Sequence, residues 1–137
     1  MKFFVDTSSL FKKYIDEAGN AAFDQLLAKA SEIVVAPTTW IEMNHVIERC
    51  LRDKRLTSDG AERLRREIRT DFSYYSIVIW NENLEDKAIQ MLRHHPLKTM
   101  DAVQLAAGFL SDSDLFITSD HQLHLASKKS LKQVRFI

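Results

Sequence analysis

Short apolar segments rich in β-branched and aromatic residues alternate with amphipathic helical segments along the whole chain. This alternation predicts strands at residues 2–5, 32–36, 75–80, 115–118 and 133–136, with helices between them. Two strands joined by a crossover helix run parallel, because the helix returns the chain to the same end of the sheet. The expected fold class is therefore α/β, a sandwich with a mostly parallel sheet.

Capping residues and helix breakers set the expected helix boundaries. Ser8 or Ser9 would cap a first helix, which Gly19-Asn20 would break. Pro37 suits the first turn of a long helix that reaches about Asp53. The other helices are expected at residues 23–30, 61–72, 82–94 and 100–110, with a cap within 56–59 for the second of these and at Thr99 for the last. Residues 120–127 are expected to form a short helix or a turn.

The size and composition are those of one globular domain, residues 1–137, with 45% hydrophobic and 28% charged residues. No apolar run is long enough to span a membrane, and Asp6 falls where a signal peptide would need its apolar stretch. The single cysteine, Cys50, cannot form an internal disulfide and is expected to be buried. These features favour a cytoplasmic location.

The net charge is formally zero, which is less basic than many nucleic-acid-binding domains. The charge is unevenly spread, however. Residues 49–69 contain eight Lys or Arg against four Asp or Glu. The segment after position 120 contains basic residues and no Asp or Glu. Such clusters are either solvated helix surfaces or basic faces that contact a polyanion.

Two of the predicted strands lead into an acidic residue. Residues 2–5 run into Asp6, and residues 115–118 are followed by Ser119 and Asp120. Ligands of open parallel sheets bind beyond the carboxyl ends of the strands. If these two strands are neighbours, Asp6 and Asp120 share one crevice. Taken singly, each acid also suits a turn or a helix cap.

Two further acids lie early in predicted helices. Asp101 stands in the first turn of the segment TMDAVQLAAGFL, whose Ala and Gly residues would let the helix lie close to the sheet. Glu42 lies early in the helix after the second strand and shares a face with His45 and Arg49. Each acid also fits a purely structural role. Asp101 is equally suited to stabilise a helix N-terminus, and Glu42 is equally suited to a solvated helix surface.

Carboxylates that converge without a cation repel one another, and a hard divalent ion removes this cost. Oxygen ligands without cysteine or paired histidine favour Mg²⁺ or Mn²⁺ over zinc. Such an ion can activate and orient a water and stabilise an in-line attack on phosphate. The five histidines have no zinc-ligand spacing, and no serine or cysteine nucleophile with a base is recognisable.

Four motifs in this order resemble the PIN domain, and the resemblance covers essentially the whole chain. They are VDTSSL at the start, the Glu early in the helix after the second strand, KTMDAVQLA, and LFITSDHQL near the end. Within the PIN domain they are most similar to VapC-type toxins of toxin–antitoxin pairs. The departures are Met100, where Leu or Ser is common, and the neutral net charge.

The resemblance implies a Rossmann-like α/β/α sandwich around a central parallel sheet, and an endoribonuclease that depends on Mg²⁺ or Mn²⁺. It implies a structured RNA as substrate, a small antitoxin protein as partner, and a homodimer. Carried onto this chain, the catalytic and metal-binding acids would be Asp6, Glu42, Asp101 and Asp120, with Asp6 and Asp101 as principal ligands. Ser8 and Ser119 would hold the acids or a water. Apart from the resemblance, the basic excess at residues 49–69 together with Lys98 beside the site predicts contact with the RNA substrate.

Two other classes fit parts of the sequence. A degenerate PIN-like module would bind RNA or protein without cutting, although all four acids are present. A phosphotransfer domain would use Asp6 as its nucleophile. A haloacid-dehalogenase-like phosphatase would then need an Asp two residues on, where Ser8 stands. A receiver would need an acid pair near its first strand and a Lys late in a strand, whereas only Lys98, in a loop, is available.

Overall fold

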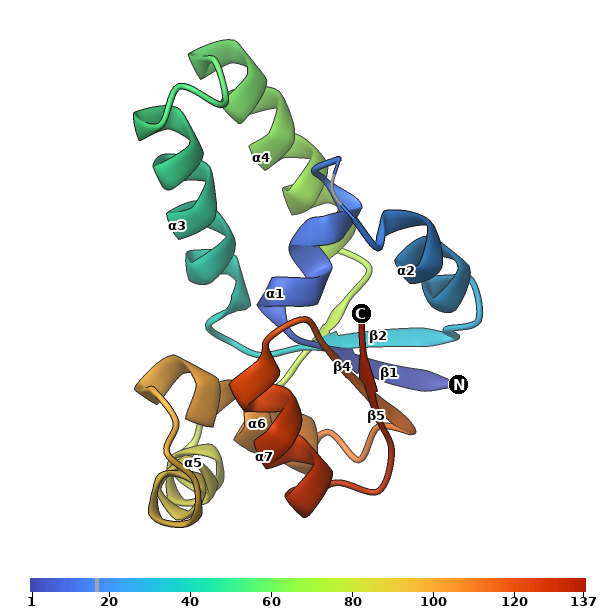
Figure 1. Ribbon diagram of the computed structural model, residues 1–137, viewed down its shortest axis with the longest axis vertical. Coiled ribbons are helices and arrows are strands. Elements are labelled where there is room, and N and C mark those ends of the chain that lie inside the picture. Colours follow the sequence, from blue (N-terminus) through green and yellow to red (C-terminus); the bar gives the residue numbers. More distant parts are fainter. Residues whose placement is uncertain (17) are drawn as a thin grey trace.

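The computed structural model describes residues 1–16 and 18–137 and has a five-stranded sheet in the order β3-β2-β1-β4-β5. Every neighbouring pair of strands is parallel. Helices cover both faces of the sheet, and all strands point their carboxyl ends the same way (Figure 1). The α/β/α sandwich expected from the sequence is confirmed.

The elements follow one another in the predicted alternation. In chain order they are β1 (Lys2–Val5), α1 (Thr7–Leu10), a 3-10 helix η1 (Phe11–Lys13), α2 (Asn20–Leu27), β2 (Glu32–Val35), α3 (Thr39–Arg52), α4 (Ser58–Phe72), β3 (Ser76–Ile77), α5 (Glu82–His94), α6 (Thr99–Leu110), β4 (Leu115–Thr118), α7 (His121–Ser130) and β5 (Val134–Phe136).

The two faces of the sheet carry separate hydrophobic cores. Successive side chains of a strand point to opposite faces. Phe3 and Val5 therefore join the core under α1 to α4, whereas Phe4 joins the core under α5 to α7. In Figure 1, α3 and α4 form a pair of helices that rises from one face of the sheet. No helix in residues 1–16 and 18–137 has the length and apolarity needed to cross a membrane.

Helix α6 lies unusually close to the sheet. A Cβ atom added at Gly108 would lie 2.5 Å from two ring carbons of Phe116 and 3.3 Å from Phe4. These two rings are stacked at 5.2 Å, so neither can move aside easily. The small residues of α6 thus give the close approach predicted from its composition, which brings the first turn of α6 to the ends of the strands.

Several predicted boundaries were wrong. Strand β3 has two residues, not six, because its partner β2 ends at Val35 and the chain turns away at Pro37. The last backbone hydrogen bond between these two segments runs from Val78 N to Val35 O. The first helix begins directly after β1 with Asp6 as N-cap, so neither Ser8 nor Ser9 caps it. Helix α6 begins at Thr99 with Lys98 as N-cap, so Thr99 does not cap it.

Candidate functional site

The site is built at the carboxyl ends of two neighbouring strands. Strands β1 and β4 are paired with Val5 opposite Ile117, and the backbone N–H of Asp6 donates to the Ile117 carbonyl at 2.9 Å. The condition for a shared crevice, that these two strands are neighbours, is met. As a result, Asp6 and Asp120 leave the sheet at the same edge, as the topology of a parallel sheet requires.

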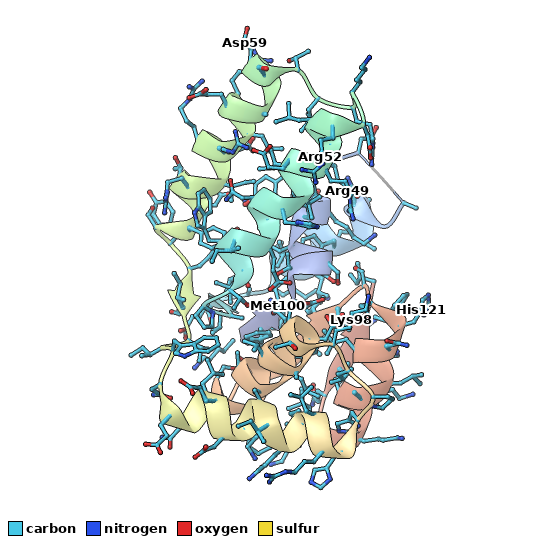
Figure 2. All side chains as sticks on the ribbon, turned by 90° about the vertical axis from the view of Figure 1, so that its left-hand side faces the viewer. Arg49, Arg52, Asp59, Lys98, Met100 and His121 are labelled. Atoms are coloured by element: carbon cyan, nitrogen blue, oxygen red, sulfur yellow. The ribbon has the colours of Figure 1, made fainter. Side chains whose placement is uncertain are left out.

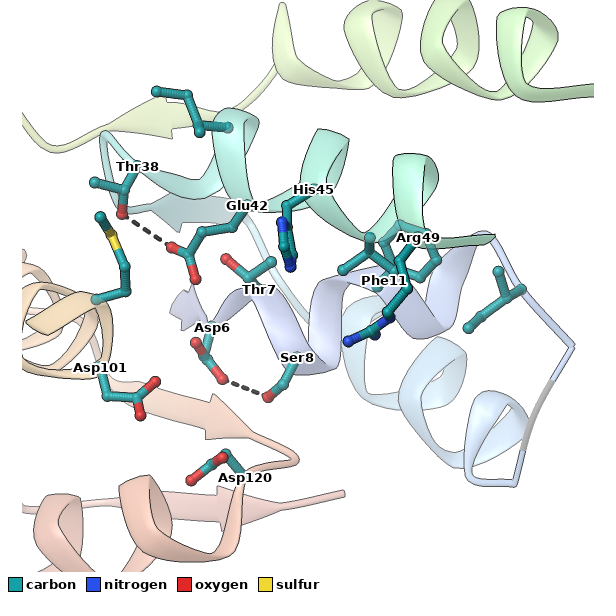
Figure 3. Close-up of a pocket in the computed structure, with 14 residues that line it drawn as sticks. Asp6, Thr7, Ser8, Phe11, Thr38, Glu42, His45, Arg49, Asp101 and Asp120 are labelled. Atoms are coloured by element: carbon teal, nitrogen blue, oxygen red, sulfur yellow. Dashed lines mark hydrogen bonds between the residues drawn. The ribbon is translucent and has the colours of Figure 1, made fainter. Parts of the chain in front are cut away.

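An open cleft of about 730 Å³ lies at this edge. All four predicted acids line it, together with Ser8, and Figure 3 shows their side chains around one space. Ser119 and Lys98 do not line the cleft. The remaining lining comes mainly from α1, η1 and α3, which supply Thr7, Phe11, Ile41, His45, Val46 and Arg49, together with Thr38 at the N-cap of α3, Ile15 and Met100.

Asp6 is the most buried of the four acids, with 3% of its surface exposed. The hydroxyls of Ser8 and Thr118 both donate to its Oδ2, the latter at 2.9 Å. Burial raises the pKa of Asp6 to about 7; the two hydroxyls lower it, and the charges of Glu42 and Asp101 raise it. The carboxylate form of Asp6 is therefore costly in this structure, and a bound cation would favour it.

The serines after Asp6 tie the two strand ends together. Ser8 Oγ accepts the backbone N–H of Ser119 at 3.0 Å while it donates to Asp6. The hydroxyl of Ser119 lies 2.8 Å from that of Ser9 and not on an acid. Ser8 therefore contacts the predicted acid directly, and Ser119 contributes through its backbone.

Glu42 is fixed by two donors at one of its oxygens. Thr38 Oγ1 donates to Glu42 Oε1 at 3.0 Å, and Gln104 Nε2 donates to the same atom at 2.7 Å. Gln104 is completely buried, and its amide also lies 2.9 Å from Thr7 Oγ1 and 3.2 Å from Thr39 Oγ1. An amide nitrogen has two hydrogens, so these three acceptors share them.

Gln104 was missed by the sequence analysis. Its one signal was a polar residue amid the small apolar residues of the helix that carries Asp101. That helix buries Ala102, Val103, Leu105 and Ala106 around it. A buried amide needs a partner, which is the physical reason for expecting Gln104 at a polar site.

Asp101 lies half-buried in the first turn of α6. Its pKa is raised by burial first and then by the charges of Asp120 and Glu42, whereas Lys98 lowers it. Because the charges of Asp120 and Glu42 raise the pKa of Asp101, these carboxylates are close enough to repel one another. Lys98 is exposed and precedes Asp101 as the N-cap residue of α6.

Asp120 has a structural task as well. It is the N-cap of α7, and its Oδ1 accepts the backbone N–H of Leu123 at 2.7 Å. Its own N–H donates to Thr118 Oγ1 at 3.1 Å. The cap engages Oδ1, so Oδ2 is the oxygen that remains for a ligand. Thr118, which bonds both Asp6 and Asp120, is a second polar residue that the sequence analysis did not single out.

The chemistry of the lining suits a hard divalent cation. Carboxylates and hydroxyls supply the ligand atoms at the acidic end, and these are the ligands that Mg²⁺ and Mn²⁺ prefer. Within the described part of the chain, no three His, Cys, Asp or Glu side chains are already grouped tightly enough to hold a metal ion. A cation would therefore have to draw these side chains together as it binds.

Comparison with known proteins identifies the fold independently. The sequence model of the PIN domain family matches residues 3–129. A search of curated proteins found no match. Among solved structures, the chain resembles the sarcin–ricin loop cleaving toxin VapC20 of Mycobacterium tuberculosis, with a TM-score of 0.70 and 19% identity over 90% of this chain and 94% of that one.

Two further structures have the same fold. VapBC2 from Rickettsia felis, bound to a DNA fragment from its promoter, gives a TM-score of 0.69 at 10% identity, covering 100% of this chain and 99% of that one. A toxin–antitoxin complex from Klebsiella pneumoniae gives 0.64 at 18% identity, covering 85% of each chain. At these identities the likeness concerns the fold.

Proposed function

The chain belongs to the PIN domain family, and on this premise we propose that it is a metal-dependent endoribonuclease, the toxin of a toxin–antitoxin pair. The observation that carries the proposal is the meeting of Asp6, Glu42, Asp101 and Asp120 at one cleft. Burial, and then the charges of neighbouring acids, raise the pKa values of Asp6 and Asp101, and a cation bound here would favour their charged forms.

Asp6 and Asp101 are proposed as the principal ligands of Mg²⁺ or Mn²⁺, with Glu42 and Asp120 completing the set. When bound, the ion would activate a water and stabilise charge on the phosphate oxygens. Hydrolysis forms a bond from the water oxygen to phosphorus and breaks the bond to one sugar oxygen, which gains a proton. Ser8 and Thr118 hold Asp6 in place, and Thr38 and Gln104 hold Glu42.

The substrate proposed is a structured RNA. The similar VapC20 is described as a sarcin–ricin loop cleaving toxin, which makes folded RNA the first class to test. Lys98, exposed just before Asp101, is proposed to contact the RNA backbone. A small antitoxin is the proposed protein partner, since similar structures include a toxin–antitoxin complex and VapBC2. The cytoplasm is the proposed location, and a homodimer the proposed assembly.

The proposal is tested in cells by brief induction of the gene, followed by sequencing of RNA ends. The wild type should arrest growth and create new ends at one or a few sites in structured RNA. Asp101→Asn, produced at the same level, should do neither. If both proteins gave identical RNA ends, the nuclease proposal would be contradicted. The remaining reading would be a module that binds RNA or protein without cutting it.

A further inference from the structure

Helix α3 presents a row of polar side chains to the cleft. Glu42, His45 and Arg49 are spaced by three and four residues, which places them on one face of a helix, and all three line the cleft. Figure 3 shows His45 and Arg49 leading away from the four acids along this helix. The cleft thus has an acidic end and a second end lined by an imidazole and a guanidinium.

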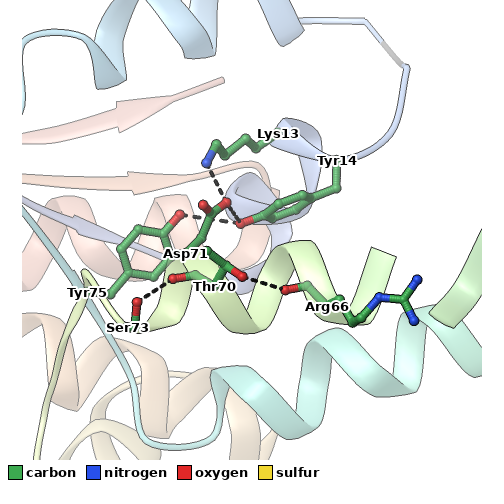
Figure 4. A network of polar contacts seen from close by, with 7 residues as sticks. All are labelled: Lys13, Tyr14, Arg66, Thr70, Asp71, Ser73 and Tyr75. Carbon is green, nitrogen blue, oxygen red and sulfur yellow. Dashed lines mark hydrogen bonds and ion pairs between the residues drawn. The ribbon is translucent and has the colours of Figure 1, made fainter. Parts of the chain in front are cut away.

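The side chain of Arg49 has no protein counter-charge among the described residues, in contrast to Lys13 and Arg65. Lys13 pairs with Asp71 within a network of two tyrosines (Figure 4). Arg65 pairs with Glu48, and Arg69 lies over the Trp40 ring at 4.1 Å. Within residues 1–16 and 18–137, no ion pair or hydrogen bond engages the exposed side chain of Arg49.

An unpaired arginine in a cleft is a ready ligand for phosphate. Its planar guanidinium carries five donors in a fork that matches phosphate oxygens, and it stays charged at all physiological pH values. Ile15 and Val46 also line the cleft and offer apolar surface to a sugar or base. In Figure 2, Arg49 and Arg52 lie above Met100 and Lys98, with His121 beside Lys98.

We propose that Arg49, assisted by His45, forms a phosphate-binding subsite for an RNA strand whose neighbouring phosphate lies at the acidic end. This inference rests on the proposed function. Seven residues of helix separate Glu42 from Arg49, roughly 10 Å along the axis. At about 3.4 Å of rise per stacked nucleotide, Arg49 meets a phosphate about one to three nucleotides from the scissile one. Regularly spaced phosphates suit a cation held by the four acids at one end and Arg49 at the other, which favours RNA over an acidic peptide.

The first test compares single variants on one structured RNA whose cleavage site has been mapped. Arg49→Ala should raise KM about tenfold or more, as expected for the loss of a charge-assisted hydrogen bond, and change kcat little. Arg49→Lys should lie between the two, because a point charge replaces a fork of donors. His45→Ala should have a smaller effect than Arg49→Ala. Arg93→Ala, which removes the same charge from an exposed position of α5, is the control and should behave as wild type.

Salt dependence and neutral phosphates identify the contact itself. Arg49→Ala should lower the slope of log Kd against log salt by roughly 0.7, the value for one phosphate of a single strand. A methylphosphonate placed about one to three nucleotides from the cleavage site should weaken the wild type at one position and leave Arg49→Ala unaffected there.

Direct binding of the same RNA, followed by fluorescence anisotropy, separates this inference from the proposed function. Arg49-dependent binding without any cleavage would overturn the nuclease and support the subsite. Cleavage with the same KM, salt slope and methylphosphonate pattern in wild type and Arg49→Ala would overturn the subsite. In that case Arg49 would be available for a protein partner instead.

Discussion

Gln104 Nε2 donates a hydrogen bond to Glu42 Oε1 at 2.7 Å, and this bond joins α6 to α3 beneath the cleft. Asp101 and Gln104 are three residues apart on α6, so the helix that supplies one acid also holds another in place. The bond engages one oxygen of Glu42 together with Thr38, which leaves Oε2 as the oxygen that can turn towards a cation.

Gln104→Leu should therefore impair the site and the fold together. The loss of a buried hydrogen-bond donor leaves Thr7, Thr39 and Glu42 without it, which should lower the free energy of unfolding by about 1–3 kcal/mol. Urea unfolding measures this cost. A positioning role predicts in addition a weaker affinity for Mn²⁺, with RNA binding unchanged. Gln25→Leu, at an exposed position of α2, is the control. An unaltered Mn²⁺ affinity in a folded Gln104→Leu protein would remove the positioning role.

Gly108→Ala tests whether the close packing of α6 places Asp101. The added Cβ would meet the Phe116 ring at 2.5 Å, so the helix must move away from the sheet. Overpacking of this kind should cost about 1–3 kcal/mol of stability and weaken the response to Mn²⁺. Gly60→Ala, whose nearest obstacle is the single hydroxyl of the N-cap residue Thr57 at 3.0 Å and not an aromatic ring, should be milder. Equal effects of the two substitutions on thermal unfolding would contradict this account of α6.

The raised pKa of Asp6 predicts how metal-free stability depends on pH. The folded-state pKa of about 7 exceeds the ordinary value of 3.8, so the folded state keeps its proton where the unfolded chain has lost it. Stability should therefore fall as pH rises from about 4 to about 7 and then level off. Asp6→Asn should show a clearly smaller fall, because its amide oxygen can accept both hydroxyl bonds without a charge and only the raised pKa of Asp101 then contributes. Urea unfolding in EDTA across this range measures it, and parallel curves for both proteins would contradict the assignment.

Much of the site followed from the sequence because it depends on strand ends. Residues 2–5 and 115–118 are short and apolar, so their boundaries and the positions of Asp6 and Asp120 could be predicted. The extent of β3 could not, because it depends on where its partner β2 stops. Gln104 and Thr118 were missed because their partners lie 62 and 112 residues away in the chain, which no local pattern reveals.

Thermal melts of Asp101→Asn distinguish a metal ligand from a helix cap. Burial and neighbouring acids raise the pKa of Asp101, so removing its charge should leave metal-free protein at least as stable at neutral pH. The variant should also lose most of the rise in Tm that Mn²⁺ gives the wild type, which grows as RT ln(1 + [L]/Kd). If Asp101 only stabilised the helix N-terminus, Asp101→Asn would instead lower the free energy of unfolding by up to about 1 kcal/mol. Neither protein would then gain stability from the metal.

The most direct measurement is cleavage of a structured RNA by purified protein, with Mg²⁺, with Mn²⁺ and with EDTA. We expect cleavage only in the presence of a divalent ion. Asp6→Asn and Asp101→Asn should each lower the rate by several orders of magnitude, because groups that act as a unit are not additive. Both variants should keep their fold, as checked by circular dichroism. Cleavage in EDTA, or undiminished cleavage by either variant once contaminating nuclease is excluded, would contradict the assignment of this cleft as a metal-dependent nuclease site.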